Sequence, residues 1–82
     1  MKEELLKISY VENGEKHEWI SVGTYDDPKH PRRKYCYSEG GPWTTWFDGA
    51  ENLQDCLSWL WKNVIDAKAV IEKNLTIIVE KA

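Results

Sequence analysis

The dipeptide Asn13-Gly14 is the feature that most restricts how this chain can fold. Both residue types tolerate positive φ angles, and an Asn-Gly pair between two alternating apolar runs is the strongest short-range signal for a tight β-hairpin. Residues 5–11 before it and residues 16–25 after it both alternate well enough for strands. The sequence therefore predicts two antiparallel strands joined by a two-residue turn.

The position of the turn also predicts which residues of the two strands lie opposite each other. With these two residues in the loop, Ile8 pairs with Trp19 and Tyr10 pairs with His17. Because side chains alternate between the faces of a strand, this register divides the apolar residues between both faces. It leaves open which face is buried. One face would carry Leu6, Ile8, Tyr10, Trp19 and Tyr25, and the other Leu5, Val11, Ile20 and Val22.

A third strand is predicted after a proline-containing loop. Residues 26–31 include two prolines, which remove backbone donors and fix φ, so this segment fits neither a helix nor a central strand. Residues 33–38 then alternate two tyrosines with Lys34 and Cys36, which is a strand pattern.

A fourth strand is predicted beyond the turn at residues 40–42, which reads Gly-Gly-Pro. Residues 43–47 are rich in threonine and aromatic residues, and both types favour strands. A two-residue Gly-Gly turn would place Tyr35 opposite Trp46. Trp43, Phe47 and Cys36 would then share the other face.

The clearest helix signal follows this fourth strand. Asp48 can accept hydrogen bonds from the free amides of a first helical turn, and Glu51 can reach back to it, which is a capping-box arrangement. Trp59 lies away from the centre of the apolar stripe, either at its edge or in solvent. The stripe itself, at helical spacing, comprises Leu53, Leu57, Leu60, Trp61 and Val64, with Cys56 beside it.

The pattern after Asn63 permits two interpretations. Asp66 could cap a second helix over residues 67–73, or the first helix could continue through this segment, and Asn74 suits a helix end. Residues 75–80 alternate and are β-branched, so they predict a fifth strand. The predicted fold is a single α+β domain over residues 1–82. It has a four- to five-stranded, mainly antiparallel sheet in ββββα(α)β order, with one long or two short helices packed on one face.

Composition sets limits on the core and on the compartment. A chain of 82 residues buries only about 60% of its unfolded surface, yet this one carries five tryptophans and four tyrosines. No stretch reaches the roughly 18 apolar residues of a membrane helix, and residues 1–4 lack the layout of a signal peptide. Cys36 and Cys56 are therefore expected to be reduced thiols, with a disulfide as the less favoured alternative. We expect a cytoplasmic protein with no membrane partner.

Residues that could support catalysis or bind a metal are few. Cys36 or Cys56 could act as a nucleophile with His17 or His30, but a catalytic thiol needs a neighbouring base and an electropositive setting. A cysteine beside an apolar helical stripe is typically a small core residue. The cysteines and histidines lack zinc-ligand spacing, and the Gly-Gly-Pro turn is too short for a phosphate-binding loop. We expect no enzymatic activity, no cofactor and no metal.

A basic and aromatic segment is the most informative functional feature. The net charge of −3 disfavours a general nucleic-acid binder, yet four cations fall within six residues. The rings that follow exceed what one small helix face can cover, and tryptophan and tyrosine are common hot-spot residues of interfaces. The predicted binding residues are Lys29, Arg32, Arg33, Lys34, Tyr35, Tyr37, Trp43 and Trp46.

This segment has three interpretations. The cations could neutralise neighbouring acids while the tyrosines pack in the core, or the segment could dock on an acidic protein. Alternatively, the strand from Arg32 to Tyr37 could bind nucleic acid by phosphate contacts and base stacking. The leading hypothesis is a non-catalytic macromolecule-binding protein, a small inhibitor or modulator that docks on a protein partner. In size and composition it is similar to phage- or mobile-element-encoded anti-defence proteins. The sequence leaves the oligomeric state open.

Overall fold

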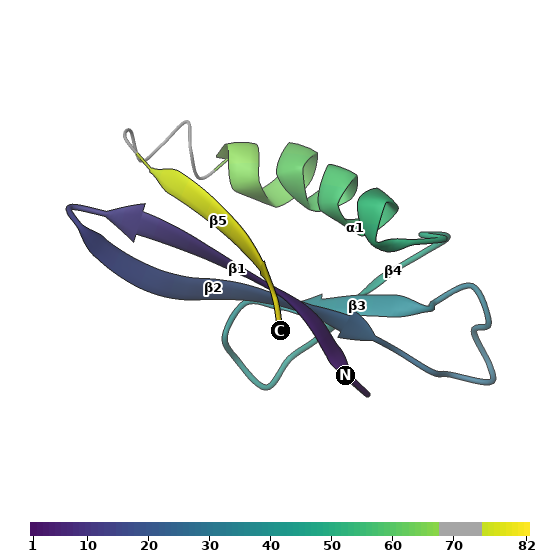
Figure 1. Ribbon diagram of the computed structural model, residues 1–82. Helices are drawn as coiled ribbons and strands as arrows, with labels where there is room; N and C mark the ends of the chain where they lie inside the picture. The colour runs from purple at the N-terminus through teal and green to yellow at the C-terminus, as the bar shows by residue number, and fades with distance from the viewer. Residues whose placement is uncertain (68–74) are drawn as a thin grey trace.

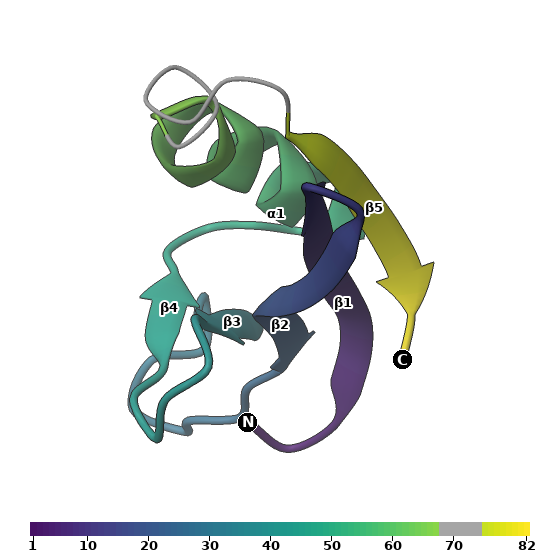
Figure 2. The ribbon, with the colours of Figure 1, turned by 90° about the vertical axis from the view of Figure 1, so that its left-hand side faces the viewer.

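The computed structural model describes residues 1–67 and 75–82. The elements are β1 (Glu4–Glu12), β2 (Glu15–Thr24), β3 (Tyr35–Ser38), β4 (Thr45–Phe47), α1 (Leu53–Leu60), the π-helical turn η1 (Trp61–Ile65) and β5 (Thr76–Lys81). The strands form one antiparallel sheet in the order β4-β3-β2-β1-β5. Helix α1 and its continuation η1 lie over one face of this sheet (Figure 1), between the edge strands β4 and β5 (Figure 2).

The predicted fold class is confirmed by this arrangement. The element order, the antiparallel pairing and the helix on one face all agree with the sequence-based expectation. The predicted second helix over residues 67–73 and its end at Asn74 lie almost entirely outside the described residues. The fifth strand begins at Thr76, one residue later than predicted.

The long hairpin contains the predicted turn. Asn13 and Gly14 have φ angles of 52° and 79°, which are the positive values that a tight type I′ turn needs. Tyr10 pairs with His17 as predicted, but Ile8 pairs with Ile20 and not with Trp19. The register changes between Ile8 and Ser9 because Trp19 is an extra residue, so the predicted register is wrong beyond this β-bulge.

The bulge decides which side chains form the core. Since it shifts the pairing by one residue, Ile20 and Val22 lie on the same face as Leu6 and Ile8, and all four are buried. The prediction that these two pairs lie on opposite faces is therefore wrong. The opposite face carries ion pairs instead, including Lys7–Glu18 at 3.3 Å and Lys16–Glu80 at 2.6 Å.

The register of β3 and β4 also differs from the prediction by one residue. Tyr35 pairs with Phe47, and Cys36 pairs with Trp46. The connection occupies residues 39–44, because Ser38 Oγ donates a hydrogen bond to the Gly41 carbonyl at 2.9 Å and holds a wider turn than Gly-Gly alone. Phe47 consequently shares the helix-facing side with Tyr37, while Trp46 points to the other face.

The helix begins four residues later than predicted. Gly49 has a φ of 84°, which a right-handed helix does not accommodate, so Asp48 does not cap the helix. Asn52 is the N-cap, and its Oδ1 accepts the Asp55 N–H at 2.9 Å. Asp55 Oδ2 in turn accepts the Glu51 N–H at 2.9 Å. The capping pair is thus Asn52 with Asp55, three residues apart.

Most of the predicted stripe packs on the core: Leu60 is fully buried, and Leu53, Leu57 and Val64 pack against the core while partly buried. Cys56 and Leu60 are fully buried, and the next buried residue is Ile65. The spacing of five between Leu60 and Ile65 matches the wider π-helical turn. Trp61, which the sequence places on the buried stripe, is 43% exposed, so this part of the prediction is wrong. The core cluster comprises Leu6, Ile8, Ile20, Val22, Tyr37, Phe47, Ala50, Cys56, Leu60 and Ile65.

The position of each leucine on this helix predicts different effects of truncation. Leu60→Ala should lower the free energy of unfolding by about 2 to 5 kcal/mol, because it leaves a cavity at a fully buried site. The loss in the free energy of unfolding should be smaller for Leu57→Ala than for Leu60→Ala, by about 1 kcal/mol or more, because Leu57 is only partly buried against the core. Urea unfolding of both variants measures the difference. An equal or larger loss at Leu57 would contradict this packing.

Candidate docking surface

Four tryptophans of this small protein are substantially exposed. Trp43 is 85% exposed, and Trp46, Trp59 and Trp61 are 42%, 44% and 43% exposed. Trp43 and Trp46 lie just before and within β4, and Trp59 reaches from α1 to Phe47 of that strand. We call Trp43, Trp46 and Trp59 the tryptophan edge. Trp61 lies elsewhere, in a groove between the helix and β5 that also contains Val79.

Trp46 is held in place by two neighbours. The centroid of the Trp46 ring lies 5.8 Å from that of the Tyr25 ring. The Arg33 guanidinium lies 4.4 Å from the centroid of the Trp46 ring. Arg33 Nε also donates to Asp48 Oδ1 at 2.9 Å. Because a cation over a tryptophan face is attracted by the ring quadrupole, this contact orients the indole at the surface.

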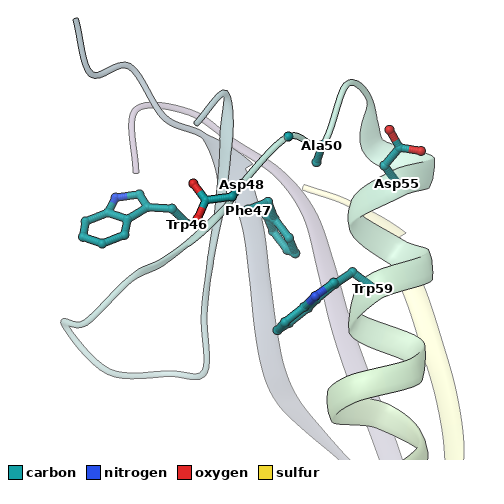
Figure 3. A pocket seen from close by; sticks show the side chains of 7 residues that line it. Trp46, Phe47, Asp48, Ala50, Asp55 and Trp59 are labelled. Atoms are coloured by element: carbon teal, nitrogen blue, oxygen red, sulfur yellow. The ribbon is translucent and has the colours of Figure 1, made fainter. Parts of the chain in front are cut away.

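Trp59 is positioned by the core, although nearly half of it is exposed. Its ring lies 5.8 Å from Tyr37 and 5.7 Å from Phe47, nearly perpendicular to the latter. Figure 3 shows Trp59 reaching from the helix toward Phe47 while Trp46 points away from both. The two tryptophans therefore flank β4 on opposite faces of the sheet.

Trp43 is presented by the connection between β3 and β4. The Trp19 indole N–H donates to Glu39 Oε1 at 3.2 Å, which ties this connection to β2. Trp43 borders a shallow hollow of about 210 Å³ whose other lining residues include Tyr37 and Thr45. The most exposed ring in the described residues thus lies beside the helix-facing side of β4.

The predicted basic residues are divided between internal ion pairs and open surface. Arg33 pairs with Asp48, and Lys34 Nζ lies 2.8 Å from Glu51 Oε2, a contact that raises the pKa of Lys34. Arg32 lies against the backbone of Gly49, and within the described ranges neither it nor Lys29 forms an ion pair. The predicted cluster is therefore partly neutralised by neighbouring carboxylates.

The loop that carries these cations is internally braced. Asp27 accepts from the Lys29 N–H at 2.9 Å, and its second oxygen lies 2.8 Å from His30 Nδ1. The hydrogen bond to His30 is the main cause that lowers the pKa of Asp27. The basic loop thus has a defined shape without any partner.

The predicted aromatic residues are also divided. Trp43 and Trp46 are exposed as described, Tyr35 is partly buried, and Tyr37 is only 8% exposed because it packs 5.2 Å from Phe47. Trp59 was absent from the predicted binding residues, although its position away from the helical stripe was the available signal. The structure therefore moves the aromatic surface from the tyrosines of β3 to the tryptophans around β4.

A larger hollow lies between β4 and the start of α1, with a volume of about 350 Å³. Phe47, Ala50 and Trp59 form its apolar part, and the acidic residues Asp48 and Asp55 line it on the two sides of Ala50 (Figure 3). Gly49 and Trp46 complete the lining. The hollow thus adjoins the tryptophan edge.

The two cysteines lie in the interior and are not bonded to each other. Cys36 and Cys56 are free thiols and both are fully buried. Burial raises the pKa of Cys36, and burial together with the Asp55 charge raises the pKa of Cys56 to about 11. Both environments disfavour the reactive thiolate.

Across residues 1–67 and 75–82, no group of three or more His, Cys, Asp or Glu side chains could hold a metal ion.

Comparisons with protein families, with curated proteins and with solved structures find no match to this chain. In the part of the chain that the structure describes, no helix has the length and apolar character needed to span a bilayer.

The buried thiols predict slow labelling in the folded protein. With a disulfide reagent at pH about 8, both cysteines should react far more slowly in the folded protein than in guanidinium, because they are inaccessible and protonated. Equal labelling rates with and without denaturant would contradict the burial.

The raised pKa of Cys56 also predicts that stability depends on pH. Between pH about 9 and about 11 the thiol of the unfolded chain loses its proton before the thiol of the folded protein does, so the free energy of unfolding falls as the pH rises. This fall should be smaller in Cys56→Ala, and urea unfolding of both proteins across this pH range measures it.

Proposed function

We propose that this protein is a non-catalytic binding protein that docks on a protein partner through the tryptophan edge. The observation that carries the proposal is the 85% exposure of Trp43 next to two further exposed tryptophans around one strand. Each large ring can bury about 150–250 Å² in an interface, and apolar burial contributes roughly 25 cal/mol per Å². Three such rings can therefore supply a docking hot spot.

The free side of β4 indicates what form the partner takes. Strand β4 is at the edge of the sheet and, within the described residues, pairs only with β3. An unpaired edge offers backbone N–H and C=O groups to an additional strand. We infer that the partner contributes an extended segment that pairs with β4, with its side chains against the flanking indoles.

A protein is a better-supported partner than a nucleic acid. The nucleic-acid hypothesis used the segment from Arg32 to Tyr37, but Tyr37 is buried and two of the cations are paired with carboxylates. The net charge of −3 also opposes phosphate binding. The exposed tryptophans, in contrast, match the residue types that dominate protein interfaces.

We further predict that docking inhibits or modulates the partner. A small protein that occupies a partner's surface can change the partner's activity in this way. Once a partner is isolated, its activity with and without stoichiometric amounts of this protein tests that role directly.

Two exposed tryptophans make a matched pair for testing the surface. Trp43→Ala should weaken partner binding by at least about thirtyfold, the effect of a hot-spot residue worth about 2 kcal/mol. Trp61→Ala, which removes an exposed ring in the groove beside β5, should leave binding within about twofold of the original. The original protein, Trp43→Ala and Trp61→Ala each serve as bait for affinity capture from source cells. The partner is the protein that the original and Trp61→Ala retain and that Trp43→Ala loses. Calorimetry with this purified partner then measures the dissociation constant for each of the three.

Folding of both variants should be unaffected, because exposed side chains away from special features usually change stability by under about 0.5 kcal/mol. Thermal unfolding checks this. If every captured protein binds Trp43→Ala as tightly as it binds the original, the tryptophan edge is not the docking surface.

A further inference from the structure

The hollow between β4 and α1 has the two features that a cationic side chain requires. Its inner part is apolar, because Phe47 and Ala50 are buried and the Trp59 ring lines it. Its lining also includes two acidic residues, Asp48 and Asp55, on the two sides of Ala50 (Figure 3), and the Asp48 carboxylate is already paired with Arg33. At about 350 Å³ it lies at the small end of the pocket sizes that enclose ligands, so it suits one long side chain.

One of these carboxylates has unused capacity. Asp55 Oδ2 accepts a single hydrogen bond from the Glu51 N–H, and no cation within the described ranges pairs with this side chain. An ionised carboxylate can accept several hydrogen bonds. Trp59, which lines the same hollow, is 44% exposed, so part of its indole is open to a ligand.

The protein already contains an example of the recognition that this hollow offers. On the other face of β4, Arg33 lies 4.4 Å from the centroid of the Trp46 ring and donates to Asp48 at 2.9 Å. An arginine thus combines ring stacking with a carboxylate contact. Trp59 and Asp55, four residues apart on α1, provide the same two kinds of group beside the hollow, and within the described ranges no cation pairs with Asp55.

We propose that the hollow binds an arginine side chain of the partner's extended segment. Its guanidinium would lie against the Trp59 ring and donate to Asp55, while its methylene stem lies on Phe47 and Ala50. Arginine fits better than lysine because a planar guanidinium both stacks on rings and donates in a fork to carboxylates. This inference rests on the proposed function and names the partner's chemistry: an extended segment with an arginine that lies beside the Phe47 end of β4.

The probe is a blocked seven-residue peptide of alternating threonine and valine with arginine at its centre. The matched peptide carries citrulline, which has the same shape without the charge. Binding is followed by the indole N–H signals of the tryptophans in ¹H–¹⁵N spectra. The protein variant is Asp55→Asn, whose amide oxygen can still accept the Glu51 N–H, and the control variant is Asp66→Asn on the same helical segment.

The arginine peptide should shift the Trp59 signal in a saturable manner and more than the Trp61 signal. Citrulline in the peptide, or Asp55→Asn in the protein, should each weaken binding by about three- to tenfold, and the two changes together should weaken it no further. Asp66→Asn should change it by less than about twofold. Equal affinity for the two peptides, or no measurable binding of the arginine peptide, overturns the inference.

The peptide measurement and the capture experiment fail in different ways. If Trp43→Ala abolishes partner binding while the peptides do not distinguish arginine from citrulline, the docking surface stands and the arginine site is wrong. If the partner ignores Trp43→Ala, the proposed function itself is wrong, whatever the peptides show.

Discussion

The β-bulge at Trp19 places the apolar residues of both hairpin strands on one face of the sheet. Without the extra residue, Ile20 and Val22 would face away from Leu6 and Ile8. The apolar side chains of the hairpin would then be divided between the two faces of the sheet. With it, one face becomes apolar enough to hold a helix. The opposite face is free to carry ion pairs such as Lys7–Glu18. A single helix can then complete the core of the described fold.

The exposed tryptophans follow from how that helix is placed. Gly49 has a positive φ and α1 begins only at Leu53, so Asp48 lies outside the helix and pairs with Arg33, which in turn stacks on Trp46. At the other end of the helix, the π-helical turn brings Ile65 into the core, while Trp61 at its start is exposed. The surface around β4 therefore results from local backbone choices, and internal contacts fix the orientation of Trp46 and Trp59.

The sequence predicts well those features that depend on neighbouring residues. Asn13-Gly14 predicts the hairpin, alternation predicts the strands, and the apolar repeat predicts the helix, because turn chemistry and periodicity act locally. The bulge, the N-cap at Asn52 and the π-helical turn depend on which arrangement packs best in three dimensions. A hint of the bulge existed in the apolar residues on both predicted faces of the hairpin. In the candidate site, the number of aromatic residues in so short a chain predicts that Trp43 and Trp46 are exposed. The burial of Tyr37 depends on how β3 pairs with β4, and the exposure of Trp59 depends on where the helix lies on the sheet, and neither can be read from neighbouring residues.

Trp43, Trp46 and Trp59 are more exposed to water than Trp19, which packs against the core. Fluorine NMR of protein labelled with 5-fluorotryptophan measures this directly, through the shift of each signal between H₂O and D₂O, with signals assigned by single Trp→Phe substitutions. The structure predicts the largest solvent shift for Trp43, intermediate shifts for Trp46 and Trp59, and the smallest shift for Trp19. A Trp43 shift as small as that of Trp19 would show that Trp43 is buried and that the tryptophan edge does not exist in solution.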